Sequence, residues 1–299
     1  MDYRVYLQDF MPRCDFPDEA IASLLKDYDT VHRDPHCGAQ FDALVLLFDK
    51  DLLDRYQDAL DCLRRLAEQV DVPYQAVHML YLLCLSRRTR ELYEARGISE
   101  QIYWMTMKDM TWKLLECHRF VEIWGTNTAP WFERFFRLTR FALGRLQFEP
   151  NISPQRYEKG GVILEPGDLV LGVHIPSCGP LDEDACMDAF RQAAEFFADL
   201  FGEKPAAFRC NSWLLYKEHG RILPEGSNIR KFMNFFDVIE TRTSSGGDLW
   251  RIFYRKDTDD LSKLPQKAIL QRAYVKMLQE GTPPGAGIGY FFLKDGKIM

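Results

Sequence analysis

Apolar residues in the first half of the chain recur at spacings of three and four, from Pro17 to about Leu143. This period matches the turn of an α-helix, and the breaks between periodic segments carry Pro, Gly or Asp. The first half is therefore predicted to be helical. The predicted helices lie at Pro17–Tyr28, Gly38–Phe48, Asp51–Val70, Pro73–Glu94, Ser99–Val121 and Pro130–Leu143.

After Gly144 the pattern changes to short apolar runs that are typical of strands. Glu165-Pro166-Gly167-Asp168 separates two of these runs and is typical of a tight turn, which predicts an antiparallel hairpin over residues 162–175. The predicted strands lie at Arg145–Phe148, Gly161–Leu164, Asp168–Ile175, Ala207–Leu214, Leu249–Tyr254 and Gly289–Leu293, with helices at Asp182–Phe201, Ser227–Phe236 and Pro265–Gln279.

This change of period predicts an α+β protein with an all-helical domain over residues 1–142 and a mixed domain over residues 143–299. The length of 299 residues and the hydrophobic content of 46% suffice for two packed cores. The net charge of −6 and the lack of a basic run argue against a nucleic-acid partner. The amino terminus lacks the features of a signal peptide and no window is apolar enough to span a membrane, so we expect a cytoplasmic protein.

The eight cysteines form no C-x-x-C pair, and Cys62, Cys84 and Cys186 fall on apolar helical positions. This favours reduced, buried thiols over a disulfide framework. His32, His36 and Cys37 lie close in sequence, but a fourth ligand is missing and the spacing matches no standard metal site. We expect a loop there and no metal.

The segment from Asp168 to Leu200 reads as an apolar strand, a loop P-S-C-G-P-L and a long amphipathic helix. A helix that begins near Leu181 exposes backbone N–H groups and the positive end of its dipole, and Gly179 allows close approach of the backbone. This order predicts a candidate pyrophosphate site. The alternative is a strand-turn-helix connection that holds no ligand.

The order of elements resembles the core of the GNAT superfamily of acyl-CoA-dependent N-acyltransferases. Four segments are similar to a bacterial group of acyltransferases that joins a helical amino-terminal domain to a GNAT-like carboxyl-terminal domain. The resemblance covers essentially the whole chain and implies a mixed, mostly antiparallel sheet flanked by helices. It also implies acyl transfer from acyl-CoA to a small-molecule or peptide amine. The segments are L-G-R-L-Q-F-E at 143–149, G-D-L-V-L-G-V-H-I-P-S-C-G-P-L at 167–181, C-N-S-W-L-L at 210–215 and L-P-E-G-S-N-I at 223–229.

In GNAT proteins one central strand pairs with the pantetheine arm of acyl-CoA, and the next helix begins at the pyrophosphate. The resemblance implies that the backbone of Val173 and Ile175 pairs with pantetheine and that Asn228, at the start of a later helix, lies near CoA. The loop holds a single glycine and no basic side chain, so backbone N–H groups would have to hold the phosphates. The residues implied there are Ser177, Cys178, Gly179, Pro180 and Leu181.

Acyl transfer to an amine needs a base for the amine proton and donors for the developing oxyanion. His174 is the predicted base, because it ends the strand that would run beside the thioester and its ordinary pKa of about 6.5 suits proton transfer at neutral pH. Alternation places Val170, Gly172 and His174 on one face, where Gly172 would leave room for a ligand. The alternative is a buried histidine that binds a backbone carbonyl.

Four more residues are candidates for the reacting centre. Ser212 is a candidate oxyanion donor or proton relay, and Trp213 is a candidate wall of the acyl pocket, although a plain core strand explains both. Gln147 and Glu149 are candidates to face the acceptor amine. For Glu149 the alternative is a solvated carboxylate at a strand end.

Two further functions stay open. In one, Cys178 or Cys210 is a nucleophile that works with His174, although no third orienting residue can be named. In the other, the chain is a non-catalytic module that binds acyl-CoA or a partner protein. Phe235 and Phe236 favour the second, because many GNAT enzymes carry a tyrosine acid in this region.

Overall fold

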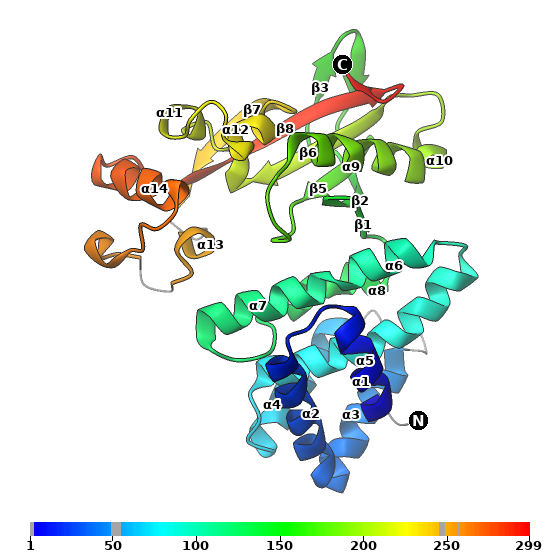
Figure 1. Cartoon of the computed structure of the whole chain (residues 1–299). Coiled ribbons are helices and arrows are strands. Elements are labelled where there is room, and N and C mark those ends of the chain that lie inside the picture. The colour runs from blue at the N-terminus through cyan, green and yellow to red at the C-terminus, as the bar shows by residue number, and fades with distance from the viewer. Residues whose placement is uncertain (1–2, 49–54, 245–248, 256–257) are drawn as a thin grey trace. The chain divides into compact units, whose positions relative to one another are not determined.

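The computed structural model describes residues 3–48, 55–244, 249–255 and 258–299. The chain divides into two compact units, Met1–Ala142 and Leu143–Met299. The first is built of helices, and the second contains the main sheet (Figure 1).

The helical unit is built around α5 (Tyr74–Ala95), in which every residue from Ala76 to Leu85 is buried. A helix that is buried all round forms the centre of a core, and six other α-helices, α1, α2, α3, α4, α6 and α8, contact it. The remaining elements are α1 (Tyr3–Arg13), α2 (Asp18–Arg33), α3 (Pro35–Phe48), α4 (Tyr56–Gln69), α6 (Glu100–Met107), α7 (Asp109–Val121), the 3-10 turn η2 (Ala129–Phe132) and α8 (Glu133–Phe136).

The helical character of this half is confirmed, but several boundaries differ. Helix α1 was not predicted, and the predicted helix Ser99–Val121 is broken at Lys108 into α6 and α7. The second helix begins with Asp109, which is buried and accepts a hydrogen bond from Trp131 Nε1 at 3.2 Å. The predicted start of α4 at Asp51 lies outside the described residues.

Two segments of this half were predicted wrongly. The expected loop at His32, His36 and Cys37 is helical apart from Asp34, whose carboxylate accepts the backbone N–H groups of His36 and Cys37 and so caps α3. The helix predicted to end at Leu143 stops at Phe136, because Leu138 adopts a left-handed φ of +55°. Residues Phe141–Leu143 form a strand instead.

A seven-stranded sheet forms the second unit, in the order β1-β2-β5-β6-β8-β7 with β9 paired to β8. Strands β5 and β6 are parallel, whereas the β2–β5, β6–β8, β7–β8 and β8–β9 pairs are antiparallel. The predicted mixed, mostly antiparallel sheet is confirmed. The strands are β1 (Phe141–Leu143), β2 (Leu146–Ile152), β5 (Leu169–His174), β6 (Ala206–Ser212), β7 (Asp237–Thr243), β8 (Gly285–Lys294) and β9 (Lys297–Ile298).

The two faces of this sheet differ in chemistry. Helix α9 (Glu183–Phe196) covers one face, where Phe190 contacts Phe148, Phe208 and Phe291 with ring centroids 4.8 to 6.0 Å apart. The other face carries polar side chains from β2, β5 and β6. The helical segments around the sheet are α10 (Ala198–Phe201), η3 (Trp213–Leu215), α11 (His219–Ile222), α12 (Asn228–Met233), α13 (Leu249–Phe253), η4 (Leu261–Lys263) and α14 (Ile269–Gln279).

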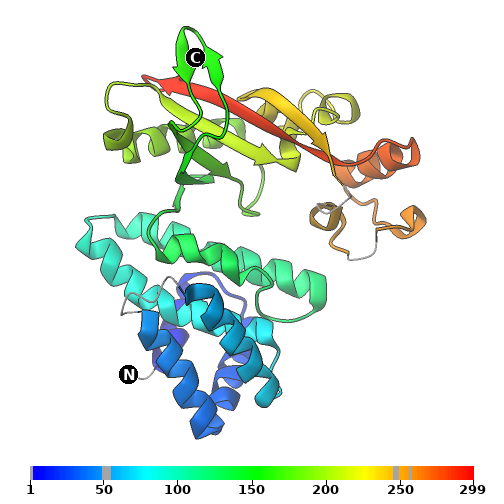
Figure 2. The same ribbon diagram turned by 180° about the vertical axis from the view of Figure 1, so that it is seen from behind.

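The predicted hairpin over residues 162–175 is wrong in its pairing. Strand β4 (Val162–Leu164) pairs with β3 (Tyr157–Lys159), and β5 pairs with β2. Gly160-Gly161 has positive φ at both residues and forms the two-residue turn of the β3–β4 hairpin, which lies beside the carboxyl-terminal end of the chain (Figure 2). The turn at Glu165–Asp168 is present, but it connects the hairpin to β5.

Two further assignments in this half need correction. The segment Leu249–Tyr254 was predicted as a strand but forms α13, because Leu249, Ile252 and Phe253 lie on one helical face and are buried. Strand β7 was missed, since only part of its surface is buried and its polar residues hide the alternation. Short apolar runs fit either period, so packing decides between them.

Candidate active site

A buried glutamate and a histidine meet on the polar face of the sheet. His174 Nε2 lies 2.9 Å from Glu149 Oε1, and Asn151 Nδ2 donates to the same oxygen at 3.1 Å. The pairing register places Glu149 opposite Gly172 and His174 opposite Gln147, so all these side chains share one face. The side chain of Glu149 is 6% exposed and that of His174 is 26% exposed. The alternative of a solvated Glu149 is therefore wrong.

This pairing defines how the imidazole is protonated. A carboxylate accepts hydrogen bonds, so His174 donates its Nε2–H to Glu149 and the basic lone pair of the ring lies on Nδ1. The arrangement resembles the carboxylate–histidine pairs of other enzyme sites. In such pairs the histidine is the base, and the carboxylate fixes the ring and stabilises its protonated form.

The space above Gly172 is occupied. A Cβ atom added at this glycine would lie 2.6 Å from Asn151 Nδ2 and 3.4 Å from Glu149 Cγ. The expectation that Gly172 leaves room for a ligand is wrong, because the glycine makes room for the two side chains that hold His174 in place.

Gln147 lies next to this pair and is almost fully buried, with 1% exposure. Its Oε1 atom is buried and has no hydrogen-bond partner among the described residues. A buried carbonyl oxygen without a donor is costly, which points to a ligand that supplies an N–H or O–H group.

The parallel strands β5 and β6 separate beside His174. Their register pairs Leu171 with Phe208 and Gly172 with Arg209, and it ends there, two residues before β5 ends at His174. Such an opening between adjacent strands exposes backbone groups on the β6 side of β5 and is where a ligand can add main-chain hydrogen bonds. Val173 and Ile175, the predicted pantetheine contacts, lie at this opening.

The predicted phosphate loop follows β5 directly. Ser177, Gly179 and Pro180 are exposed, Cys178 is half-buried and Leu181 is buried. Helix α9 begins at Glu183 and not at Leu181, and Asp182 Oδ1 accepts the Ala185 N–H at 3.0 Å. The first turn also carries Glu183 and Asp184, so the end of α9 offers less positive potential than predicted.

Ser212 and Trp213 do not join His174. Ser212 lies three residues after Arg209, so alternation places it on the opposite face of the sheet, and its Oγ caps η3 by accepting the Leu214 N–H. Trp213 is half-buried and packs against the core around Tyr274. The structure therefore does not bring either side chain together with His174.

Asn228 is exposed and is the first residue of α12, but the helix cap is Ser227, whose Oγ accepts the Arg230 N–H. One turn further on, Lys231 pairs with Glu183 of α9 at 3.2 Å. Helix α12 therefore lies beside the start of α9, next to the predicted phosphate loop.

The cysteine mechanism loses one of its two nucleophiles. Cys210 is fully buried, and burial raises the pKa of its thiol to about 12, so it is protonated at neutral pH. All eight cysteines are free thiols. No group of three or more metal-ligating side chains occurs in the described part of the chain.

Comparison with known proteins identifies the family. A family model for a GNAT-like C-terminal domain matches residues 140–291, just over half of the chain. The chain belongs to this GNAT-like family. A second model, for an N-acyltransferase N-terminal domain, matches residues 6–138 of the same GNAT-like protein. These matches confirm the predicted resemblance and support acyl transfer from CoA as the activity. A sequence comparison with curated proteins gave no match.

The fold of the GNAT-like chain is shared with solved acyltransferases. One is an acyltransferase in complex with decanoyl-CoA and teicoplanin, with a TM-score of 0.75, 23% identity, and coverage of 96% of this chain and 88% of that chain. Another, in complex with decanoyl-CoA, has a TM-score of 0.75 and 24% identity with the same coverage. A variant enzyme with octanoyl-CoA has a TM-score of 0.75, 23% identity, and coverage of 97% and 88%.

Within the described residues of the GNAT-like chain, no helix has the length and apolar character needed to cross a membrane. Two side chains at the site were missed from the sequence: Asn151 and Arg145. The alternation of Gln147, Glu149 and Asn151 along β2 was a usable signal for the first, since residues two apart share a face. The position of Arg145 depends on contacts with a distant segment, the loop after β5.

Proposed function

We propose that this protein transfers the acyl group of acyl-CoA to an amine acceptor bound on the polar face of the sheet, with His174 as the base. The observation that carries the proposal is the His174–Glu149 pair at 2.9 Å, placed where β5 and β6 separate. Membership of the GNAT-like family supports acyl-CoA as the donor. The site geometry supports the position of the thioester beside His174.

The proposed acyl transfer forms one bond, breaks one bond and moves one proton, with groups on this face of the sheet. The nitrogen of a neutral amine attacks the thioester carbonyl carbon, the new C–N bond forms, and the C–S bond to CoA breaks. His174 Nδ1 takes the proton that the amine loses, and Glu149 stabilises the resulting imidazolium. The proton then passes to the departing thiolate, directly or through water, to give an amide and free CoA.

Gln147 supports an amine acceptor. Its buried Oε1 lacks a donor, and it lies opposite His174 in the register of the two strands. An amine N–H directed at this oxygen would satisfy it and would point the nitrogen lone pair toward the thioester. A small-molecule or peptide amine fits this requirement equally.

Binding of the donor is tested first. CoA, acetyl-CoA and decanoyl-CoA are added to the protein and the melting temperature is measured. A ligand that binds only the native state at a hundredfold excess over its Kd adds about 2.7 kcal/mol of stability, so a clear rise is expected. The absence of any rise with all three ligands would contradict the proposal.

Catalysis is then tested by CoA thiol release from decanoyl-CoA with a panel of primary amines, including teicoplanin because a similar structure holds it. His174→Ala is expected to lower kcat by about 10² to 10⁴-fold with little change in acyl-CoA binding. The matched control is His36→Ala, which removes an exposed histidine of α3. Unchanged turnover of His174→Ala would remove this residue from the mechanism.

A further inference from the structure

One arginine holds the loop that follows β5 by three hydrogen bonds. Arg145 Nη1 donates to the Pro176 carbonyl at 3.1 Å, Nη2 to the Gly179 carbonyl at 2.6 Å and Nε to the Pro180 carbonyl at 2.8 Å. The planar guanidinium presents its donors in a fixed fork, which suits several acceptors spread along one loop. Arg145 is half-buried, and its own carbonyl lies 3.9 Å from Cys178 Sγ.

The turn between β1 and β2 delivers this side chain to the loop. Gly144 has a φ of +63°, and a Cβ atom there would lie 3.3 Å from the Cα and Cβ atoms of Ala189 on α9. Glycine therefore allows the turn to pack tightly on the helix that follows the loop. This places Arg145, the next residue, beneath the segment Pro176–Pro180.

The bonds to Arg145 also orient the backbone N–H groups of the loop. In a trans peptide unit the N–H points away from the C=O of the preceding residue. The Pro176 and Pro180 carbonyls point to Arg145, so the N–H groups of Ser177 and Leu181 point away from it. Neither N–H has a hydrogen-bond acceptor in the described part of the chain.

The positive charge of Arg145 is not neutralised locally. Its three partners are neutral carbonyls, and no described carboxylate forms an ion pair with it. The start of α9, by contrast, carries Asp182, Glu183 and Asp184, which oppose an anion. The charge that favours a phosphate at this loop therefore comes from Arg145.

We propose that Arg145 is a positioning residue for the CoA pyrophosphate: it holds the loop Pro176–Leu181 so that the Ser177 and Leu181 N–H groups face the phosphates, and it supplies the attracting charge. This inference rests on the proposed use of acyl-CoA. It explains how a loop with one glycine and no basic side chain of its own can serve this purpose.

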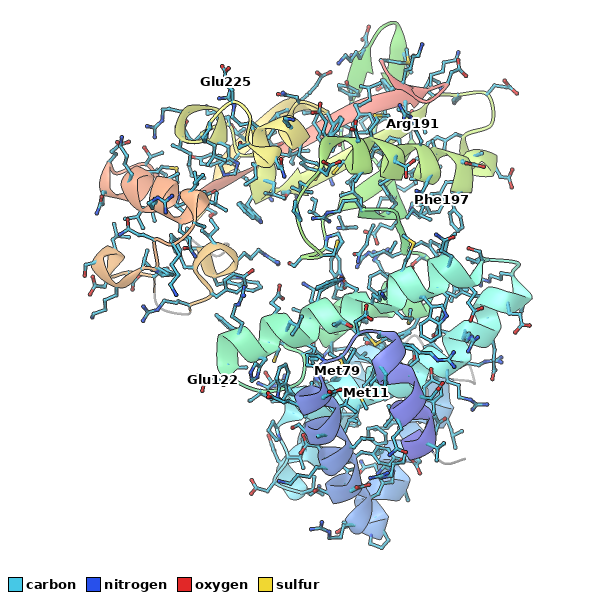
Figure 3. The ribbon with its side chains drawn as sticks, in the orientation of Figure 1. Met11, Met79, Glu122, Arg191, Phe197 and Glu225 are labelled. Atoms are coloured by element: carbon cyan, nitrogen blue, oxygen red, sulfur yellow. The ribbon has the colours of Figure 1, made fainter. Side chains whose placement is uncertain are left out.

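The test compares two donors, of which only one carries the group that Arg145 is proposed to serve. Decanoyl-CoA carries the pyrophosphate, and S-decanoyl-pantetheine lacks the pyrophosphate together with the 3′-phosphoadenosine attached to it. Titration calorimetry on the full chain gives the Kd of each for the wild type, Arg145→Ala and Arg145→Lys. The matched control is Arg191→Ala, because Arg191, labelled on α9 in Figure 3, also donates to a backbone carbonyl, that of Gly296 at 3.1 Å.

Arg145→Ala is expected to raise the Kd of decanoyl-CoA at least about tenfold and to leave that of S-decanoyl-pantetheine unchanged. Arg145→Lys keeps the charge but cannot reach three carbonyls, so its Kd should be intermediate. Arg191→Ala should match the wild type with both donors. Weakening that is equal for the two donors would indicate general damage and would overturn the inference.

The outcomes also separate this inference from the proposed function. Wild-type protein that binds decanoyl-CoA no better than S-decanoyl-pantetheine would refute a pyrophosphate site at this loop altogether. Wild-type protein that prefers decanoyl-CoA, with Arg145→Ala showing the same preference, would refute only the role of Arg145.

Discussion

At the scale of single residues, the site depends on how Glu149 is held. The carboxylate is buried, accepts from Asn151 and from His174, and occupies the space that Gly172 leaves open. Burial of a carboxylate is costly unless hydrogen bonds satisfy it, so this arrangement ties Glu149 to His174 and Asn151. Its negative charge then orients the imidazole and stabilises its protonated form during transfer.

Replacement of this charge with a neutral amide tests that role. Glu149→Gln keeps the size of the side chain and an oxygen that can accept the His174 Nε2–H, but it loses the stabilisation of the imidazolium. We expect kcat to fall about 10²-fold while the KM for decanoyl-CoA stays unchanged. Initial-rate kinetics with the best acceptor of the amine panel measure both constants.

The control for this prediction is Glu158→Gln, which changes an exposed glutamate of β3 that pairs with Arg156. Its kinetics should match those of the wild type. If Glu149→Gln retained full kcat, the carboxylate would have no part in the proton transfer, and His174 would need another partner.

Part of this site could be predicted from the sequence and part could not. His174, Gln147 and Glu149 were candidates because alternation along a strand shows which residues share a face. The pairing of His174 with Glu149 depends on the register between strands β2 and β5, and the sequence alone does not show this register. Arg145 contacts carbonyls 31 to 35 residues further along the chain, and no local pattern indicates such a contact.

At the scale of elements, a local sequence signal indicates the correct helix, strand or turn only where it fits a single type of element. Gly160-Gly161 is a two-residue turn signal that outweighs the turn at Glu165–Asp168, and it makes β3 and β4 the hairpin. The run Leu249–Phe253 satisfies strand and helix patterns alike, and its burial within the core around Tyr274 makes it helical.

A buried histidine joins three elements of this core. His219 of α11 is fully buried, donates from Nδ1 to the Leu214 carbonyl of η3 at 3.2 Å, and accepts at Nε2 from the Tyr274 hydroxyl of α14 at 2.6 Å. Acceptance at Nε2 needs the neutral ring, because a protonated ring carries a hydrogen on both nitrogens. Burial lowers the pKa of His219 to about 4, well below its ordinary value.

This shift predicts a pH dependence of stability. In the unfolded chain the ring takes up a proton as the pH falls through about 6.5, whereas in the folded protein it stays neutral down to about pH 4. The contribution of His219 is thus fully present above about pH 6.5 and is lost as the pH falls toward 4. Between pH 7.5 and pH 5 the loss should be about 2 kcal/mol.

Urea denaturation of the full chain at pH 7.5 and pH 5 measures this loss. His219→Phe keeps an aromatic ring in the core but cannot take up a proton. The free energy of unfolding of this variant should be lower than that of the wild type at pH 7.5. Between pH 7.5 and pH 5 it should fall by about 2 kcal/mol less than that of the wild type. An equal fall in both proteins would show that other groups carry the pH dependence.

At the scale of the whole molecule, the change of period near Gly144 predicted a helical half followed by a strand-rich half, and the structure contains both. The net charge of −6 opposes a polyanionic donor such as CoA, so its binding must depend on local groups. Arg145 and the Ser177 and Leu181 N–H groups are such local groups, at one end of the opening between β5 and β6 that His174 adjoins.

The most direct test of this arrangement is a crystal structure of the full chain with decanoyl-CoA. We expect the pyrophosphate at the Ser177 and Leu181 N–H groups, the pantetheine arm along β5 beyond the Gly172–Arg209 pair, and the thioester beside His174. Binding of decanoyl-CoA elsewhere, with the loop Pro176–Leu181 and His174 both away from the ligand, would contradict the proposed mechanism.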